Sequence, residues 1–246
     1  MKKLLILVLA LACVFSMVSC GEKTPYELYS NAVKMLKEAK GLEFEMKTSL
    51  DMSLGENEQS NSVTYAAKQN GNNFSFEVKD ADIIPFESMT YVDGVFYINA
   101  NGKKTKATLN LDELQEEIKN LIPETEDMLD LPELTKEELK NIEFNVKNGI
   151  RSFTVKLDKS DIDGLLGSLA ESIDLSEVGN VNAELSVSFD KTGNLHGFKF
   201  DIELGITAPF VGEMSCEIEI EINFKNFGNA PTITAPADAA DYVEEK

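Results

Sequence analysis

The side chains that most often carry out catalysis are scarce in this chain. His196 is the only histidine, so any serine or cysteine nucleophile that needs a histidine base would have to use it. It follows a predicted turn and shares its parity with Phe198 and Phe200, which predicts a position at the rim of a strand. Neither a glycine-rich phosphate loop nor a Gly-x-Ser-x-Gly motif is present. We therefore expect no enzymatic activity and no cofactor.

Metal ligands are equally few. Three cysteines and one histidine are too few for a zinc or iron–sulfur site of the usual kind. The segment Asp158–Gly164 has the acids of a calcium loop, but Ile162 replaces a required oxygen ligand and Leu169 replaces the final acid. The acids at 217, 219 and 221 predict a solvated strand face, with an ion-binding ladder as the alternative. A hydrolase that uses carboxylates alone is a further alternative, but a chain with 43 acids always supplies carboxylate pairs.

The N-terminus has the features of an export signal. Lys2 and Lys3 precede an apolar run, Leu4–Val18, which is shorter than a typical membrane span. The run ends in Met17-Val18-Ser19-Cys20, which resembles the bacterial lipobox, with methionine where leucine is usual. An ordinary signal peptide cut elsewhere, or an uncleaved anchor, is the alternative.

The lipobox resemblance implies a specific processed protein. Residues 1–19 would be removed as a lipoprotein signal peptide, Cys20 would be lipidated, and residues 20–246 would form a single domain. The acyl chains would hold the protein at the extracytoplasmic face of the cell membrane. With Cys13 removed and Cys20 modified, Cys216 has no cysteine partner, and its apolar neighbours predict a place in the core.

Charge narrows the possible partners. Asp and Glu number 43 against 23 Lys and Arg, which gives a formal net charge of -20. This excess argues against a nucleic-acid binder, whose affinity depends on neutralising phosphates. It also argues against attachment through anionic lipid headgroups, so the membrane is expected as a partner only through the lipid anchor. We expect a monomer.

Alternation of apolar and polar residues predicts long antiparallel strands. The clearest runs are 42–54, 198–206 and 214–224, and shorter ones lie at 63–67, 74–78 and 185–189. Further short strands are predicted within 86–109 and at 144–146 and 153–157. Gly55–Asn61 is predicted to be a polar loop. Turns are predicted at Asn70-Gly71, Asp93-Gly94, Asn101-Gly102, Asn148-Gly149 and Lys191–Asn194.

Capping boxes predict helices between the strands. Thr24–Glu27 begins a helix that ends at Gly41, Asn110–Glu113 begins a second, and Thr135–Glu138 begins a short one. Apolar spacing over Ile162–Ile173 predicts another. The fold class is therefore α+β: a large curved antiparallel sheet, an incomplete barrel, with inserted helices covering its concave face. Pro231–Lys246 is predicted to be a capping tail.

Several segments together resemble the LolA/LolB/LppX-like superfamily, and more closely uncharacterised surface lipoproteins of Gram-positive bacteria. They are the lipobox, the helix Tyr26–Lys40 leading into 42–54, Thr90–Tyr97, Phe189–Asn194, Phe224–Gly228 and Ile233–Pro236. The resemblance implies a curved sheet closed by helices, with acyl chains bound between the two. It carries no catalytic motif.

The function that follows is non-catalytic binding of an apolar ligand, a lipid or acyl chain, between sheet and helices. The residues expected to contact it point inward from the predicted strands: Phe44, Met46, Met52, Phe74, Phe76, Phe198, Phe200, Ile202, Met214 and Ile218. Phe and Met side chains adapt to varied apolar shapes. The alternative is a structural or protein-interaction lipoprotein of the cell envelope, in which these residues form a solid core and no ligand binds.

Overall fold

A single antiparallel sheet dominates the protein. The structure is a computed structural model that describes residues 23–55, 57–81, 86–110, 113, 131–158, 161, 178–208 and 212–244. Its strands are β1 Gly41–Leu54, β2 Asn57–Asn70, β3 Asn73–Ala81, β4 Phe86–Val92, β5 Val95–Ala100, β6 Lys103–Thr108, β7 Asn145–Lys147, β8 Ile150–Leu157, β9 Val178–Phe189, β10 Leu195–Ala208, β11 Gly212–Phe227 and β12 Val243–Glu244. They form one 12-stranded sheet in the order β12-β6-β5-β4-β3-β2-β1-β11-β10-β9-β8-β7.

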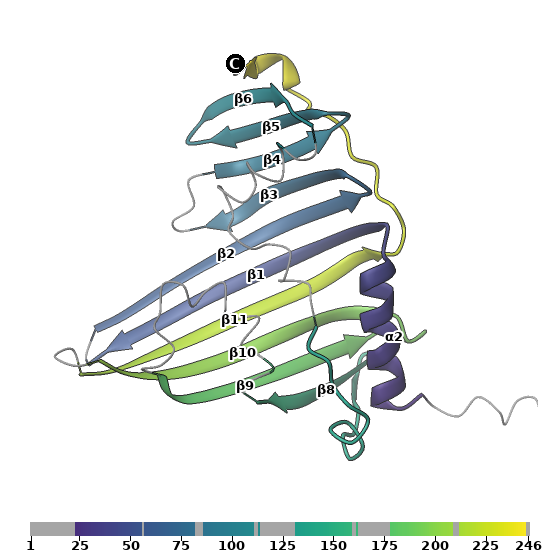
Figure 1. Ribbon diagram of the computed structural model, residues 1–246, viewed down its shortest axis with the longest axis vertical. Coiled ribbons are helices and arrows are strands. Elements are labelled where there is room, and N and C mark those ends of the chain that lie inside the picture. The colour runs from purple at the N-terminus through teal and green to yellow at the C-terminus, as the bar shows by residue number, and fades with distance from the viewer. Residues whose placement is uncertain are drawn as a thin grey trace, which may run out of the picture.

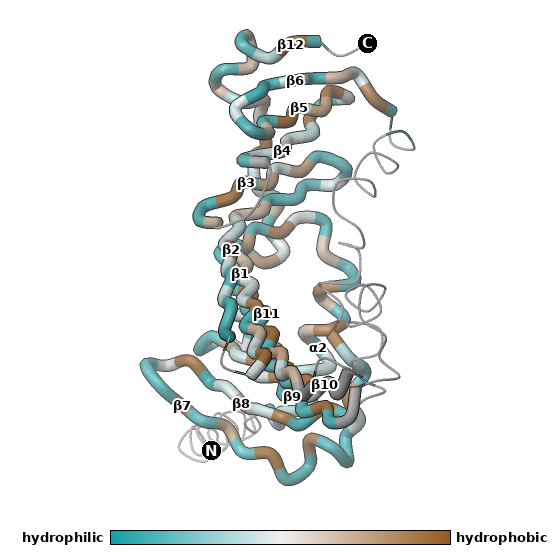
Figure 2. The backbone as a smooth tube through the Cα atoms, turned by 90° about the vertical axis from the view of Figure 1, so that its left-hand side faces the viewer, coloured by the Kyte–Doolittle hydropathy of each residue, from teal (hydrophilic) through white to brown (hydrophobic). Residues whose placement is uncertain are grey.

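The sheet is open and strongly bent. Its edge strands are β12 and β7, and every pairing is antiparallel except that of β12 with β6. Figure 1 shows long twisted strands crossing the molecule, and Figure 2 shows that β8–β10 turn toward the side that carries helix α2. Strands of this length must twist and coil, which produces the bend. The predicted curved antiparallel sheet is confirmed in the described residues.

Helix α2 (Pro25–Glu38) packs against the sheet at one end. Thr24 and Glu27 form the predicted capping box: the Thr24 hydroxyl accepts from the Glu27 amide, and the Glu27 carboxylate accepts from the Thr24 amide. Leu28, Tyr29 and Ala32 are buried on one stripe of the helix. In Figure 1, α2 lies across the ends of β8–β11, and the β1–β2 turn lies at the opposite side of the sheet.

The inserted helical blocks that were predicted to cover the sheet lie mostly outside the described residues. The capping pair Asn110–Glu113 is present, since each backbone amide donates to the other side chain at 2.9 and 3.0 Å. The predicted helix Ile162–Ile173 and the signal peptide with Cys20 lie outside the described residues.

Two local predictions were wrong. The predicted short helix after Thr135 is a turn. The capping box between Thr135 and Glu138 forms, but no helix continues from it. Leu139 of this turn is packed into the core, with 1% of its surface exposed. The predicted polar loop is a turn at Gly55, and β2 begins already at Asn57. Backbone pairing with the whole of β1 extends β2 over residues that have no apolar alternation of their own.

The tight turns were predicted correctly. Asp93, Asn101 and Asn148 have φ near 52° and each precedes a glycine with positive φ. Two successive residues with positive φ match the right-handed twist of a hairpin, and the Asn-Gly and Asp-Gly pairs permit that conformation.

Asp190 organises the turn between β9 and β10. Its carboxylate accepts from the amide and hydroxyl of Thr192 at 2.8 and 2.7 Å, and from the amide and side chain of Asn194 at 2.9 and 3.3 Å. Partial burial opposes the charged form, but these hydrogen bonds outweigh it and lower the pKa of Asp190. Gly193, at φ 85°, lies against the side chain of Leu28 of α2.

We therefore expect Asp190→Ala to lower the free energy of unfolding by about 1–2 kcal/mol at neutral pH, from the lost hydrogen bonds. A lowered pKa stabilises the fold above the unfolded pKa, and the contribution is lost as pH falls through the folded value. The difference between wild type and variant should therefore be smaller at acidic pH than at neutral pH. Urea unfolding at the two pH values measures it, and an equal difference at both would contradict the role of the carboxylate.

The C-terminal segment holds the far edge of the sheet. It leaves β11, runs along the strand ends and reaches the outer side of β6 (Figure 1). Asn70 donates to the Pro231 carbonyl at 3.0 Å, and Lys104 pairs with Asp238. Tyr242 is buried and meets Tyr97 edge-on, with ring centroids 5.3 Å apart. The predicted capping tail is thus a strap across the sheet, here called the C-terminal strap (residues 229–244).

Candidate functional site

Strand register places the apolar residues of all the long alternating runs on one face of the sheet. Directly paired residues share a face, so each row of partners crosses several strands on the same side. One such row consists of Val187, Phe198, Ile222, Met46 and Tyr65. We call this side the apolar face. Its inner positions on β1, β2, β10 and β11 carry no charged side chain in the described residues.

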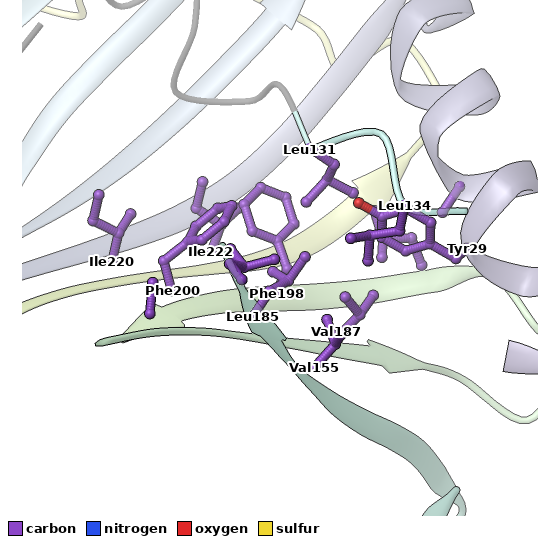
Figure 3. Close-up of a cluster of buried hydrophobic side chains, with 14 of the residues drawn as sticks. Tyr29, Leu131, Leu134, Val155, Leu185, Val187, Phe198, Phe200, Ile220 and Ile222 are labelled. Atoms are coloured by element: carbon purple, nitrogen blue, oxygen red, sulfur yellow. The ribbon is translucent and has the colours of Figure 1, made fainter. Parts of the chain in front are cut away.

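The half of the apolar face next to α2 is a solid core. Phe198, Phe200 and Ile222 are at most 2% exposed (Figure 3). Leu131 and Leu134 belong to the same buried cluster. In the segment that carries them, the Pro132 carbonyl accepts a hydrogen bond from the Tyr29 hydroxyl at 2.5 Å. Burial and the nearby acids Asp161 and Glu138 raise the pKa of Tyr29, so this hydroxyl stays protonated as a donor.

At the opposite end of the apolar face the residues of β1 are only partly covered, although Ile218 and Cys216 in the same rows are buried. Leu50, Met52 and Met214 are half-buried, and Leu54 is 36% exposed. These four residues lie at the end of β1 and the start of β11, where the register joins Met52 to Cys216 and Leu54 to Met214. We call them the distal end. Leu54 is 13 residues from Gly41, about 40 Å along the strand, and therefore far from α2.

The structure divides the predicted ligand-contact residues into three groups. Five of them are buried in the main core, on strands β1, β10 and β11: Met46, Phe198, Phe200, Ile202 and Ile218. Phe44, Met52 and Met214 are half-buried and pack against that core.

Phe74 and Phe76 form the third group, because they belong to a separate cluster on β3–β5. Phe74 stacks on Tyr91 at 6.1 Å between ring centroids, and Met89 and Phe96 complete this second cluster. The ring centroid of Tyr65 lies 4.6 Å from that of Phe76, so Tyr65 on β2 joins the two clusters to each other. Alternation assigns these residues to one face of the sheet, but strand order decides which of them meet.

A row of amides borders the distal end and was missed by the sequence analysis. Asn61, Gln59 and Asn57 pair with Leu50, Met52 and Leu54 and therefore share the apolar face with them. Asn61 is half-buried, and the other two are exposed. The signal was present as odd-numbered amides, in phase with Val63, Tyr65 and Ala67, but a polar stretch beside a glycine is also typical of a loop.

The candidates for reactive chemistry lie apart from one another. Cys216 is 2% exposed on the apolar face, and burial together with the charges of Asp51 and Glu217 raises the pKa of its thiol. His196 is exposed and lies where the β9–β10 register shifts, so the bulge removes it from the parity of Phe198. In the described part of the chain, no group of three His, Cys, Asp or Glu side chains could hold a metal ion.

The charged side chains of the central strands lie on the face of the sheet opposite the apolar face, here called the outer face. Lys199 pairs with Asp201 at 2.7 Å and with Glu219 at 2.8 Å, and these hydrogen bonds raise the pKa of Lys199 to about 12. Lys225 pairs with Glu45 at 2.9 Å. The strand-face acids at 217, 219 and 221 lie on this outer face, and Glu219 is paired with lysines there. Among the described helices, none is long and apolar enough to cross a membrane.

Comparisons with known proteins concern the fold alone. No family model and no curated protein sequence matches the chain. Solved structures similar to it include a LolA superfamily protein from Nitrosomonas europaea, at 6% identity over 79% of this chain and 94% of that one, with a TM-score of 0.23. A DUF1329 family protein from Desulfovibrio piger matches at 11% identity over 82% and 94%, with a TM-score of 0.24.

A putative outer membrane lipoprotein-sorting protein domain from Vibrio parahaemolyticus also matches, at 10% identity over 80% of this chain and 93% of that one, with a TM-score of 0.21. One of these neighbours is named as a LolA superfamily protein, the superfamily that the sequence motifs resemble. TM-scores this low carry no argument about ligands or partners, so function has to be inferred from the chain's own geometry.

Proposed function

We propose that this protein is a lipid-anchored protein of the cell envelope that binds an apolar ligand, a lipid or acyl chain, without chemical conversion. The binding surface is the distal end of the apolar face, with Leu50, Met52, Leu54 and Met214. The buried aromatic residues next to α2 support the sheet and do not line this surface.

The partial exposure of the distal end is the observation that carries this proposal. Fully buried apolar residues contribute to folding, but apolar residues left in contact with solvent beside a packed core mark a surface that another apolar molecule can cover. Four such residues are adjacent here, on strands whose backbone hydrogen bonds fix their positions. Two of the four are methionines, whose flexible thioethers adapt to acyl chains of different shape.

The anchor and the site are compatible in one molecule. A lipid on Cys20 would hold the chain at the membrane only a few residues before Thr24, where α2 is capped. The net charge of -20 disfavours direct contact with anionic headgroups, so the acyl chains would have to supply the attachment.

Replacing Met52 with glutamate should reduce ligand occupancy at least about tenfold, because a carboxylate on an apolar surface loses its hydration when a ligand covers it. Native mass spectrometry of the full chain, released from uncharged detergent micelles, measures occupancy with added dioleoylglycerol. Ser62→Glu is the matched control, since Ser62 is exposed on the outer face of β2.

The same spectra report the processed mass, and hence the removal of residues 1–19 and acylation of Cys20. Wild-type protein without any lipid adduct would contradict the proposed binding and favour the solid-core interaction protein. Equal occupancy in wild type and in the Met52 variant would place the ligand elsewhere.

A further inference from the structure

The register of β2 brings amide side chains to the edge of the proposed ligand surface. In three successive rows of the sheet a residue of β1 faces an amide of β2: Leu50 with Asn61, Met52 with Gln59, and Leu54 with Asn57. Across the other side of β1, the same rows continue into Ile218, Cys216 and Met214. The distal end is thus apolar on β1 and β11 and becomes polar, without charge, on β2.

Charged residues of these strands point to the opposite face. Asp51 pairs with Glu217 and Ser60, and Glu58 pairs with Ser53, so all three acids occupy outer positions. Alternation therefore keeps the charges of β1, β2 and β11 off the apolar face over its whole described length.

We infer that the ligand is a lipid with an uncharged headgroup that bears hydroxyl or ester groups, such as a diacylglycerol. This inference rests on the proposed function. Its acyl chains lie on Leu50, Met52, Leu54 and Met214. Its headgroup lies against Asn57, Gln59 and Asn61.

The chemistry of the amide row favours a neutral headgroup. A carboxamide both donates and accepts hydrogen bonds, so it satisfies hydroxyl and ester oxygens equally well. A phosphate or carboxylate brought to the same place would lose water and meet no cation on the described inner positions of β1, β2 or β11. The acidic excess of the chain adds further repulsion.

The test compares two lipids that have identical acyl chains and different headgroup charge. Dioleoylglycerol and dioleoylphosphatidic acid are added in turn to the full chain in uncharged detergent, and occupancy is measured by native mass spectrometry. Wild type should bind dioleoylglycerol at least about tenfold more tightly, since the charged headgroup would meet no cation on the described inner positions of these strands and is repelled by the acidic chain.

Two double variants locate the effect. Gln59→Lys with Asn61→Lys adds two cations to the apolar face and should raise affinity for dioleoylphosphatidic acid about tenfold. Ser60→Lys with Ser62→Lys adds the same charge to the outer face of the same strand and should leave the preference unchanged. The wild-type preference tests the inference even if a double variant does not fold.

Each outcome separates the inference from the function on which it rests. Equal affinity of the wild type for both lipids, or tighter binding of the phosphatidic acid, would overturn the neutral-headgroup inference and leave apolar binding intact. A gain from the outer-face lysines equal to that from the inner-face lysines would also overturn it. No adduct with either lipid would overturn the proposed function itself.

Discussion

Replacing Phe200 with alanine is expected to lower the free energy of unfolding by about 3–5 kcal/mol, the range for a large aromatic side chain removed from a core. Phe200 is 1% exposed and pairs with Leu185 and Ile220 on the neighbouring strands. Its ring lies 5.7 Å from that of Phe198, nearly perpendicular to it. Because several strands meet at this point, the cavity left by the ring cannot close easily. Urea unfolding followed by far-ultraviolet circular dichroism measures the loss.

Met52→Ala is the matched control, because it removes a half-buried side chain from the same apolar face. We expect a smaller loss of stability, about 1 kcal/mol, since part of the Met52 side chain is already in contact with solvent. The two variants together separate the residues that maintain the fold from those available to a ligand. A Met52 variant as unstable as the Phe200 variant would show that the distal end is core.

Deleting residues 237–246 should lower the free energy of unfolding by about 3 kcal/mol and cause self-association. The deletion exposes Tyr97 by removing Tyr242, which is only 6% exposed, and it removes the Lys104–Asp238 pair. It also removes β12, which pairs with Thr105 and Lys106 of β6. The uncovered edge of β6 then has free backbone groups, and such edges pair with other chains.

Thermal unfolding and size-exclusion chromatography with light scattering measure these two effects. Val243→Thr is the control, because Val243 is 66% exposed and its side chain contributes little burial. A truncated protein that remains monomeric and unfolds at the wild-type temperature would show that the C-terminal strap does not protect the edge.

Most strands could be predicted because a strand has a repeat of two residues and a core on one side only. Six apolar side chains at even positions from Met214 to Phe224 determine which side of β11 is buried, whatever its neighbours are. The hairpin turns were equally accessible, since few residues tolerate positive φ and the chain places Asn-Gly or Asp-Gly where it is needed.

The candidate site could be predicted only in part. Met52 and Met214 were recognised as inward-facing, but Asn57, Gln59 and Asn61 were assigned to a loop. Nothing in these three residues favours a strand, and their conformation comes from backbone pairing with residues 50–54. Tertiary pairing overrides weak local propensity, so residues of this kind are the ones that sequence patterns assign incorrectly.

The amino-acid sequence by itself determined the faces of the strands, the positions of the turns, the cap of α2 and the excess of negative charge. All of these depend on neighbours along the chain or on composition. Only the tertiary structure decided the order of the strands, and with it the separation of Phe74 and Phe76 from the main core, the amide border of the distal end and the path of the C-terminal strap. The physical reason is that strand pairing joins residues far apart in the chain, as Met52 is joined to Cys216, and alternation is the same for every possible partner.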